Sequence, residues 1–456
     1  MRRLIFCFDG SWNGLQAGNM PTNVQLVAES VKPVDADDGT VQIVYYDEGV
    51  GTRSDEVFRG GAFGKGLLEN LREAYRFLIF NYQQGDEIFC FGFSRGGFTA
   101  MAFVGLIRSL GILSTSSANE IDEGFRLYRE SAVTDGVDSE RLRDFRAKHC
   151  PRHCVSPEEI AWRLANVPGW DDAEASVIQI KYLGVWDAVG SLGWKVVRAL
   201  FDDKTEQFYK QFFTDIDVIA ISARHAVSID ERRKAFKPTL WNRLDDLNGG
   251  LKPTEFSDPR PYQQKWFPGD HGSVGGGGEY DGLSRGALQW IIEGAAIEKL
   301  AFNVVGDSRI SKIRYDINTP LHNTQLSAFS SFKASVKAVL ISADRGGPNR
   351  IEDVGYPARR MWALDQNYRP KNLEHLASAL SADAANFKAV SIPPEIGFDE
   401  YVVQEGDDLS RISKTHFGEA KFDGLIYKVN ADRLDSSTFI SPGEKIRLPK
   451  KPFPIA

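Results

Sequence analysis

Short apolar runs alternate with segments of helical periodicity along the first 300 residues of the chain. The runs are rich in β-branched and aromatic residues, which is typical of buried strands. They cover residues 3–9, 41–46, 88–91, 176–185 and 265–268, and 336–341 is a further candidate. Helical spacing appears over 24–31, 67–82, 98–106, 208–236 and 283–291. Strands and helices in alternation predict a mostly parallel α/β sheet.

Two long stretches interrupt this alternation. Residues 115–175 are charged and lack strand patterns, so we expect a helical insertion that lies over the sheet as a cap. Residues 195–260 are expected to contribute a second cap insertion. The prolines after Ile392 indicate a linker over 391–400. Since 456 residues exceed the size of one hydrophobic core, we expect a large domain over 1–390 and a small one over 401–449.

Charge and hydropathy narrow the function classes. The net charge of −7 argues against broad nucleic-acid binding and against electrostatic adhesion to anionic membranes. No apolar stretch approaches the ~20 residues that a membrane span requires. The first residues, MRRLIFCFDG, contain too short an apolar run for a signal peptide. We therefore expect synthesis in the cytoplasm and export by a route that needs no cleaved signal.

The cysteines do not form a disulfide framework, because there are only four in the whole chain. Cys7 and Cys90 lie in predicted strands. His149, Cys150, His153 and Cys154 stand close together, which would suit zinc, but a structural zinc site gathers ligands from two separated elements and no second cluster follows. We expect a surface turn at these residues, and neither a metal nor another cofactor in the chemistry.

One stretch carries a specific chemical signal. The apolar run 88–91 leads into Gly92-Phe93-Ser94-Arg95-Gly96, and helical periodicity follows at once. A strand, a glycine-rich turn with serine at its apex, and a helix are the context of a nucleophile elbow. The serine of such an elbow has a strained backbone, and its neighbours must lack side chains. The sequence therefore predicts Ser94 as a nucleophile.

A nucleophilic serine requires a base and an acid that orients it. All seven histidines follow Ser94, so chain order does not choose among them. We favour His271, which follows a short apolar strand in a glycine-rich loop, over His225, His322 and His375; the sequence around His225 reads as helical. For the acid we favour Asp187, at the end of the run 176–185. Alternatives are Asp217, Asp230 and, less favoured because neighbouring side chains on extended backbone diverge, Asp270.

The oxyanion of ester hydrolysis also needs donors. The N–H of Arg95, directly after the serine, is the first candidate. The second is Gly10 or Ser11, just past the first strand, where glycine lets the backbone approach a ligand closely. An ordinary strand-terminating turn capped by Asp9 is the alternative interpretation.

Seven blocks in order resemble the α/β-hydrolase-type domain of bacterial type VI secretion lipase effectors. The blocks are FDGSWN, YYDEGVGT, GAFGKGLLENLREAYRFL, GDEIFCFGFSRGGFTA, YLGVWDAVGS, HAVSIDERRKAF and WFPGDHGSVGGG. The resemblance implies a phospholipase with a Ser-Asp-His triad at Ser94, Asp187 and His271. The chain departs from the family pattern at Ser273, two residues after the histidine, where members commonly have aspartate, and at Met101, where an arginine is usual.

The C-terminal unit resembles a LysM module. The resemblance rests on Tyr401-Val402-Val403, on 406–412, on Asn430 and on 440–449. It implies a βααβ fold that binds N-acetylglucosamine glycans, above all peptidoglycan. Glycan contacts are expected from the loops on either side of the helices, at Gly406, Asp407, Asp408, Ile440, Ser441 and Pro442.

These features together predict a serine esterase of the phospholipase type that a LysM module directs to the cell wall. The resemblance implies an antibacterial effector, delivered to the periplasm of a target bacterium by type VI secretion, with a secretion-machine partner and an immunity protein. The triad is common to many ester hydrolases, so a carboxylesterase or a deacetylase of another ester stays open. A peptidoglycan-binding protein with an inactive hydrolase scaffold is the third interpretation.

Overall fold

The computed structural model describes most of the chain. The described residues are 1–10, 20–49, 62–134, 139–173, 175–190, 219–253, 258–303, 308–312, 316, 318–322, 344–389, 391–404, 407–431, 433–434, 440 and 442–452.

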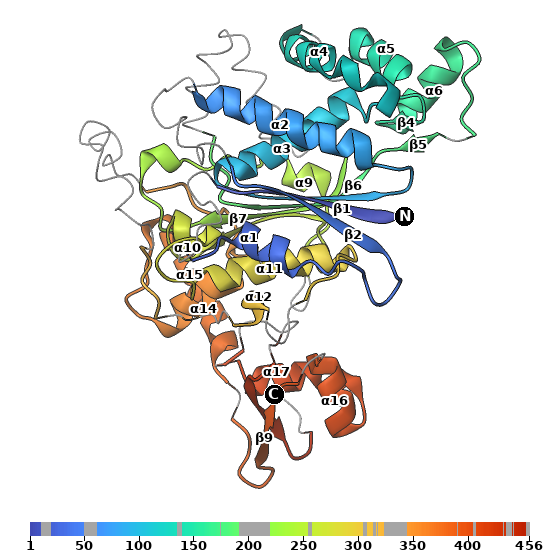
Figure 1. Ribbon diagram of the computed structural model, residues 1–456. Helices are drawn as coiled ribbons and strands as arrows, with labels where there is room; N and C mark the ends of the chain where they lie inside the picture. Colours follow the sequence, from blue (N-terminus) through green and yellow to red (C-terminus); the bar gives the residue numbers. More distant parts are fainter. Residues whose placement is uncertain are drawn as a thin grey trace.

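A six-stranded sheet with the order β2-β1-β3-β6-β7-β8 forms the centre of the large domain, and all of its pairings are parallel (Figure 1). Its strands are β1 (Arg2–Phe8), β2 (Val41–Asp47), β3 (Glu87–Phe93), β6 (Ile180–Trp186), β7 (Ala220–Ser228) and β8 (Tyr262–Phe267). The predicted α/β fold with a mostly parallel sheet is confirmed.

The strands are buried on both faces, and alternate side chains enter two different cores. Leu4, Phe6 and Phe8 of β1 pack into one core, whereas Ile5 and Cys7 pack into the other. Since successive strand residues point to opposite faces, an uninterrupted apolar run is what a sheet covered on both sides requires. This explains why these strands read as continuous apolar runs.

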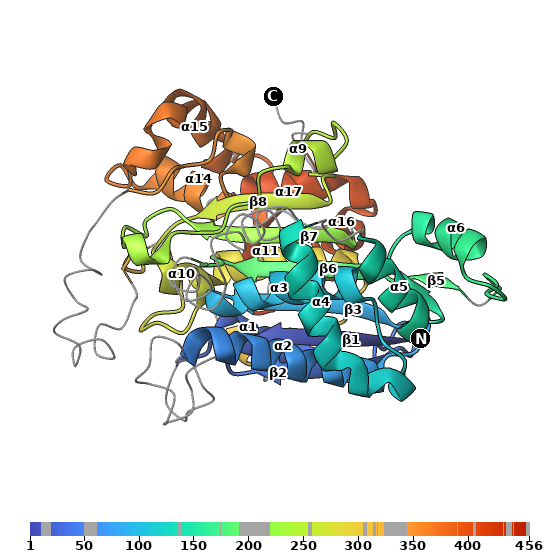
Figure 2. The ribbon, with the colours of Figure 1, turned by 90° about the horizontal axis from the view of Figure 1, so that it is seen from above.

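Helices cover the two faces of the sheet (Figures 1 and 2). The face with α2 (Ala62–Asn81) and α3 (Arg95–Leu110) also receives α4 (Ile121–Thr134) and α5 (Glu140–His149). The opposite face packs on α1 (Asn23–Ser30) and α11 (Ser284–Ile297). Shorter helices are α6 (Pro157–Asn166), α9 (Leu244–Leu247), α10 (His271–Gly275), α12 (Arg309–Lys312), α14 (Tyr356–Leu364) and α15 (Ala377–Asp383), with 3-10 turns at Thr115–Glu120, Lys234–Phe236, Ile351–Asp353, Lys371–Leu376 and Ala384–Phe387.

The insertion at 115–175 is helical as predicted, but it does not cap the carboxyl edge of the sheet. It follows the C-terminal end of α3, where Arg146 donates to the Ser109 carbonyl and the Cys150 thiol donates to the Leu110 carbonyl. Within it, β4 (His153–Cys154) pairs in parallel with β5 (Ser176–Val177), which directly follows the insertion. Because α3 runs back from the carboxyl end of β3, its C-terminus lies at the amino ends of the strands, and the insertion is anchored there (Figure 2).

Two further expectations are corrected within 195–260. The helix predicted over 208–236 is wrong for its second half, because Ala220–Ser228 is β7, a strand of the central sheet. The described part of this segment is therefore not a cap insertion, since it adds a strand to the sheet and then a loop above it. Residues 191–218 and the candidate strand 336–341 lie outside the described residues.

Residues 344–389 cover β8. Val354 and Trp362 share a core cluster with Trp266 of β8 and with Val227 and Ile229 of the β7 end. The Gly355 N–H donates to the Trp266 carbonyl at 2.8 Å. This segment therefore belongs to the large domain, as the predicted boundary at 390 requires.

The C-terminal unit is βααβ, as predicted. Antiparallel strands β9 (Phe398–Val402) and β10 (Lys445–Pro449) flank α16 (Leu409–Phe417) and α17 (Asp423–Val429), with a 3-10 turn at Ala420–Phe422 between them. Because β9 begins at Phe398, the linker is shorter than the predicted 391–400. The hydroxyl of Tyr427 donates to that of Tyr356 at 2.7 Å, so α17 touches α14.

Membrane-spanning potential is confined to one bent pair. No single described helix is long and apolar enough to cross a membrane. Among the described residues, one pair of helices, Arg95–Leu110 and Thr115–Glu130, is long and apolar enough when taken together, but the two are bent by 109° relative to each other.

Candidate active site

The site lies where the strand order reverses. From β1 the chain first adds β2 on one side of the sheet and then β3 on the other, and crevices at such switch points hold ligands in α/β proteins. Ser94 directly follows β3 and precedes α3. Its φ of 57° is in the left-handed region, so the predicted strained turn is confirmed.

Both glycines around Ser94 are required by close packing. A Cβ on Gly92 would lie 2.4 Å from the Gly96 carbonyl oxygen. A Cβ on Gly96 would lie 2.1 Å from the Phe8 carbonyl oxygen and 2.4 Å from that of Asp9. These neighbours are backbone atoms, which cannot move aside as a flexible side chain would. The glycines therefore bring the end of β1 into contact with the start of α3.

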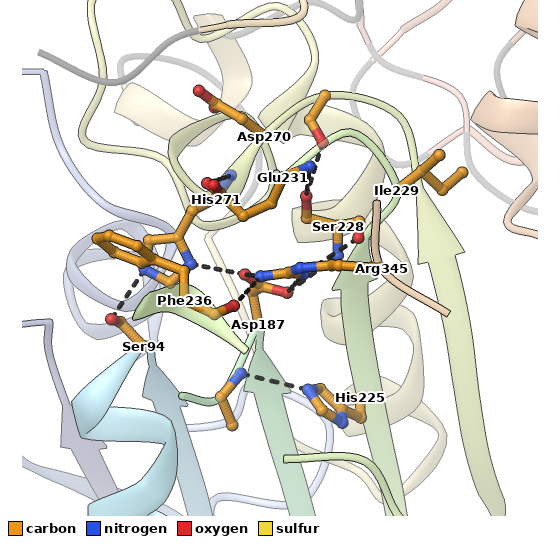
Figure 3. A network of polar contacts seen from close by, with 12 residues as sticks. Ser94, Asp187, His225, Ser228, Ile229, Glu231, Phe236, Asp270, His271 and Arg345 are labelled. Carbon is orange, nitrogen blue, oxygen red and sulfur yellow. Dashed lines mark hydrogen bonds and ion pairs between the residues drawn. The ribbon is translucent and has the colours of Figure 1, made fainter. Parts of the chain in front are cut away.

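The three favoured side chains form one hydrogen-bonded chain (Figure 3). His271 Nε2 lies 2.8 Å from Ser94 Oγ, and His271 Nδ1 lies 2.6 Å from Asp187 Oδ2. Ser94 is the N-cap residue of α3 but makes no capping hydrogen bond with its side chain, so its hydroxyl is directed at the imidazole. This arrangement can transfer a proton from the serine to His271 and hold the imidazolium against a carboxylate.

Asp187 is completely buried and is held by four donors. Its Oδ1 accepts the Ser228 N–H at 3.0 Å and Arg345 Nη1 at 2.6 Å, and its Oδ2 accepts Arg345 Nη2 at 2.9 Å in addition to His271. Burial alone would raise the pKa of Asp187, but the Arg345 guanidinium and the hydrogen bond from His271 outweigh burial and hold that pKa well below its usual range. The acid is therefore a carboxylate at neutral pH.

Sequence reasoning missed Arg345. Its position far along the chain from Asp187 gives no local pattern. An unpaired buried carboxylate is costly, so the burial of Asp187 required some cationic partner. Which cation supplies it becomes visible only in the fold.

The other acids and histidines serve different contacts. Asp270 caps α10 by accepting the Ser273 N–H at 3.1 Å, and Asp230 accepts the Gly269 N–H at 2.7 Å and the Tyr368 hydroxyl at 3.1 Å. Burial raises the pKa of Asp230 to about 6. Asp217 lies outside the described residues. Of the alternative acids that the structure describes, neither takes the place of Asp187 beside His271.

His225 is a core residue, and it lies on strand β7, where the sequence predicted a helix. Its Nε2 accepts the Ala188 N–H at 3.2 Å and its Nδ1 lies 3.1 Å from Gln264 Oε1. Burial lowers the pKa of His225 to about 4, so it is neutral near pH 7. His225 thus supports the backbone that follows Asp187 (Figure 3).

Of the three predicted oxyanion donors, Arg95 lies at the elbow. Arg95 is the first residue of α3, and an amide at that position has no acceptor within its own helix. The Gly10 N–H donates to Asp9 Oδ1 at 2.6 Å, and Ser11 lies outside the described residues. Asp9 also accepts hydrogen bonds from Thr22 and Tyr46, each at 2.6 Å. Asp9 therefore fixes the backbone just past β1, beside the serine.

A cationic loop forms one wall of the site. After β7 the chain carries Glu231, Arg232, Arg233 and Lys234, and Phe236 lies with its ring centroid 4.8 Å from that of His271. Lys234 and Lys237 on either side of Phe236 are exposed. Beyond Phe236 the loop contacts the segment that follows Asp187, through an isolated β-bridge between Pro238 and Val189. Arg232 pairs with Asp344 and Arg233 with Glu231, so Lys234 and Lys237 are the exposed charges that this loop presents.

The His149–Cys154 segment forms a turn with buried cysteines. His153 Nδ1 lies 3.1 Å from Ser176 Oγ, and the His149 ring packs on Phe145. Cys150 and Cys154 are buried and free, which corrects the expectation of a purely surface turn. Among the residues that the structure describes, no group of three histidine, cysteine or acidic side chains could hold a metal ion.

Four of the six predicted glycan-contact residues are described. Asp408 is the N-cap of α16 and accepts the Arg411 N–H at 2.6 Å, whereas Asp407 accepts the Gln404 N–H and the Tyr401 hydroxyl, each at 2.7 Å. Ile440 is buried in the core of the module, and Pro442 precedes a turn at Gly443 with φ 86°. Gly406 and Ser441 lie outside the described residues.

Comparison with known proteins adds the family. A family model for the catalytic domain of Tle1-like phospholipase effectors of type VI secretion matches residues 2–294, and a LysM domain model matches 401–449. The uncharacterized protein YEL023C of Saccharomyces cerevisiae is 25% identical over 259 residues, which cover 53% of this chain and 33% of the yeast protein. The solved structure of the Tle1 effector bound to the VgrG spike from the Type 6 secretion system aligns with a TM-score of 0.29 and 16% identity, over 61% of this chain and 51% of that one.

The chain thus spans about a third of the length of the yeast relative and about half of the Tle1 effector chain. The catalytic-domain match covers well over half of the present chain. On this ground the chain belongs to the Tle1-like phospholipase effector family of type VI secretion, and it carries a C-terminal LysM domain.

Proposed function

We propose that the protein is a serine esterase that hydrolyses carboxylic ester bonds of membrane glycerophospholipids. The observation that carries the proposal is the hydrogen-bonded chain from Ser94 through His271 to Asp187, on a strained turn at the carboxyl edge of the sheet. Membership of the Tle1-like family supports a phospholipid as substrate.

In the proposed reaction, Ser94 Oγ attacks the ester carbonyl while His271 Nε2 takes its proton. The bond from the carbonyl carbon to the leaving oxygen then breaks, and His271 returns the proton to that oxygen. Water, deprotonated by His271, attacks the acyl-enzyme and releases the fatty acid. Asp187 orients His271 and stabilises the imidazolium. The Arg95 N–H would bind the oxyanion, and Ser11 is the candidate for the second donor, because the Gly10 N–H donates to Asp9 Oδ1.

The cationic wall supports a substrate with an anionic headgroup. Lys234 and Lys237 flank Phe236, which packs on the base, so a phosphate near the reacting ester would lie within their field. An uncharged ester gains nothing from these side chains. We therefore expect anionic phosphatidylglycerol to be cleaved faster than zwitterionic phosphatidylcholine at low ionic strength.

The LysM domain supports placement at peptidoglycan through N-acetylglucosamine glycans. The family supports delivery by type VI secretion into the periplasm of a target bacterium, with a spike protein and an immunity protein as partners. Together these partners and this destination describe an antibacterial effector whose two domains act on the same envelope.

The experiment is release of fatty acid from phosphatidylglycerol and phosphatidylcholine vesicles by the purified protein beside Ser94→Ala. Release that requires Ser94 is the expected result. Turnover of short chromogenic esters alone would instead indicate a carboxylesterase. No turnover on either, with peptidoglycan still bound, would favour a binding protein with an inactive scaffold and would refute the proposal.

A further inference from the structure

We propose that Arg345 is a positioning residue of this site and that the catalytic unit therefore extends through residues 344–389, beyond the family match that ends at 294. This inference rests on the proposed function, in which Ser94, His271 and Asp187 act together. It concerns a side chain that neither family model covers, since the LysM match starts at 401.

The contact between Arg345 and Asp187 is a buried two-point ion pair. Arg345 Nη1 and Nη2 reach the two different carboxylate oxygens, at 2.6 and 2.9 Å. Only 6% of the Arg345 side chain and none of the Asp187 side chain is exposed. A planar guanidinium that meets a carboxylate at both oxygens fixes the plane of the carboxylate as well as its position. That plane decides whether Oδ2 faces His271 Nδ1 (Figure 3).

Asp187 needs such a constraint more than an ordinary residue does. Its backbone φ of 38° lies in the left-handed region, which non-glycine residues seldom adopt and which persists only where the surroundings impose it. Two constraints are present, the Ser228 N–H on Oδ1 and the guanidinium on both oxygens. Of these two, only the guanidinium holds the oxygen that faces the histidine.

Arg345 is itself held in place. Its Nη1 also donates to the Ser228 carbonyl at 3.1 Å, and its Nη2 also donates to the carbonyl of Phe236, whose ring packs on His271. Two residues after Arg345, Gly347 has no room for a side chain, because a Cβ there would lie 1.9 Å from the Asn372 carbonyl oxygen. Arg345 thus ties the acid, the cationic wall and the segment 344–389 together.

The test measures the rate at which a fluorophosphonate modifies Ser94, as a function of pH, in the full-length wild type, Arg345→Met and Arg345→Lys. The oxygen–phosphorus bond forms as the phosphorus–fluorine bond breaks and fluoride leaves, so the rate reports the activated serine without a lipid substrate. Arg359→Met is the matched control, because Arg359 makes a two-point pair with Asp383 in the same segment.

We expect Arg345→Met to react about 10²-fold more slowly than the wild type at pH 7. Arg345→Lys keeps the positive charge but lacks the planar fork of a guanidinium, so it restores only part of the rate. Arg359→Met changes the thermal midpoint and leaves the rate as in the wild type.

The outcomes separate the two proposals. No reaction of wild-type Ser94 at any pH would overturn the proposed function and this inference with it. Wild-type reactivity with an unchanged rate in folded Arg345→Met would overturn this inference alone. If Arg345→Met does not fold, Arg345→Lys decides, and a wild-type rate in that variant would overturn the positioning role.

Discussion

Replacement of Asp187 by asparagine separates the stability and the activity of the site. Each carboxylate oxygen of Asp187 accepts two hydrogen bonds. The four donor groups are the Ser228 N–H, Arg345 Nη1 and Nη2, and His271 Nδ1. An amide has one oxygen and one NH₂ group, and the NH₂ group would face two donors in either orientation. Asp187→Asn therefore cannot reproduce the native contacts.

The variant is expected to lose both stability and activity. The variant leaves the Arg345 guanidinium buried without its anion, and breaking a buried pair in this way costs about 3–5 kcal/mol of the free energy of unfolding. In the variant, His271 also tends to present the wrong tautomer to Ser94, because Nδ1–H no longer has a carboxylate acceptor. The corresponding change in a Ser-His-Asp triad lowers kcat about 10⁴-fold, which is about 5.5 kcal/mol.

The assay pairs urea unfolding with kcat on a short chromogenic ester, at a temperature where the variant is folded. Asp230→Asn is the control, because Asp230 is a half-buried acid just beyond β7 that accepts hydrogen bonds from Gly269 and Tyr368. We expect a loss of stability in both variants and the large loss of kcat in Asp187→Asn alone. A kcat of Asp187→Asn within about threefold of the wild type would refute the reasoning, since Asp187 would then only stabilise the fold.

Three other predictions follow from the structure. Gly96→Ala places a Cβ 2.1 Å from the Phe8 carbonyl oxygen, so we expect at least about 3 kcal/mol of destabilisation by urea unfolding and an ester hydrolysis rate below a tenth of the wild type's; a near-native rate would contradict the close approach. Burial raises the pKa of Asp9 from 3.8 to about 7, so the contribution of Asp9 to the free energy of unfolding is complete below about pH 4 and is lost as the pH rises through 7. Relative to Asp9→Asn, the free energy of unfolding of the wild type falls by up to about 4 kcal/mol over that range. Parallel curves of stability against pH for the two proteins would refute this. Asn430→Ala removes buried hydrogen bonds to the Ile426 and Arg447 backbone, so peptidoglycan pull-down is lost while ester hydrolysis persists; retained pull-down would contradict a structural role for Asn430.

The elbow could be predicted from the sequence because its determinants are local. A buried strand, two glycines and a helix follow one another without a break, and the close contact that requires Gly96 leaves a direct trace in residue type. His271 and Asp187 could be favoured because each follows an apolar strand, and the carboxyl ends of parallel strands meet at one edge. The choice among the acids, however, needed the distance to His271.

Strand β7 was missed because its sequence lacks a strand pattern. Ala220, Ala223 and Ala226 take the place of larger β-branched residues, and the strand is buried on both faces, so no alternation appears. Small apolar residues with polar ones between them then fit a helical period as well as a strand. The parallel pairing with β6 and β8, which decides the structure, is not a local property.

The insertion at 115–175 was expected as a cap over the sheet without a stated edge, although the sequence held a signal for where it begins. Helix α3 has 16 residues and starts at the carboxyl edge, so at 1.5 Å per residue it carries the chain about 24 Å back toward the amino edge. Whatever follows α3 therefore begins there. By contrast, no pattern around Arg345 indicates its partner, because the pairing depends on the packing of 344–389 against β8.

The central claim is that Ser94 becomes acylated by a glycerophospholipid. The most direct measurement mixes the wild-type protein with phosphatidylglycerol vesicles, quenches the reaction with acid within milliseconds, and determines the mass of the peptide that contains Ser94. The account predicts an added fatty-acyl group on Ser94 that appears before free fatty acid accumulates and that is absent from Ser94→Ala. Release of fatty acid at an equal rate by Ser94→Ala, or an acyl group on a different residue, would contradict it.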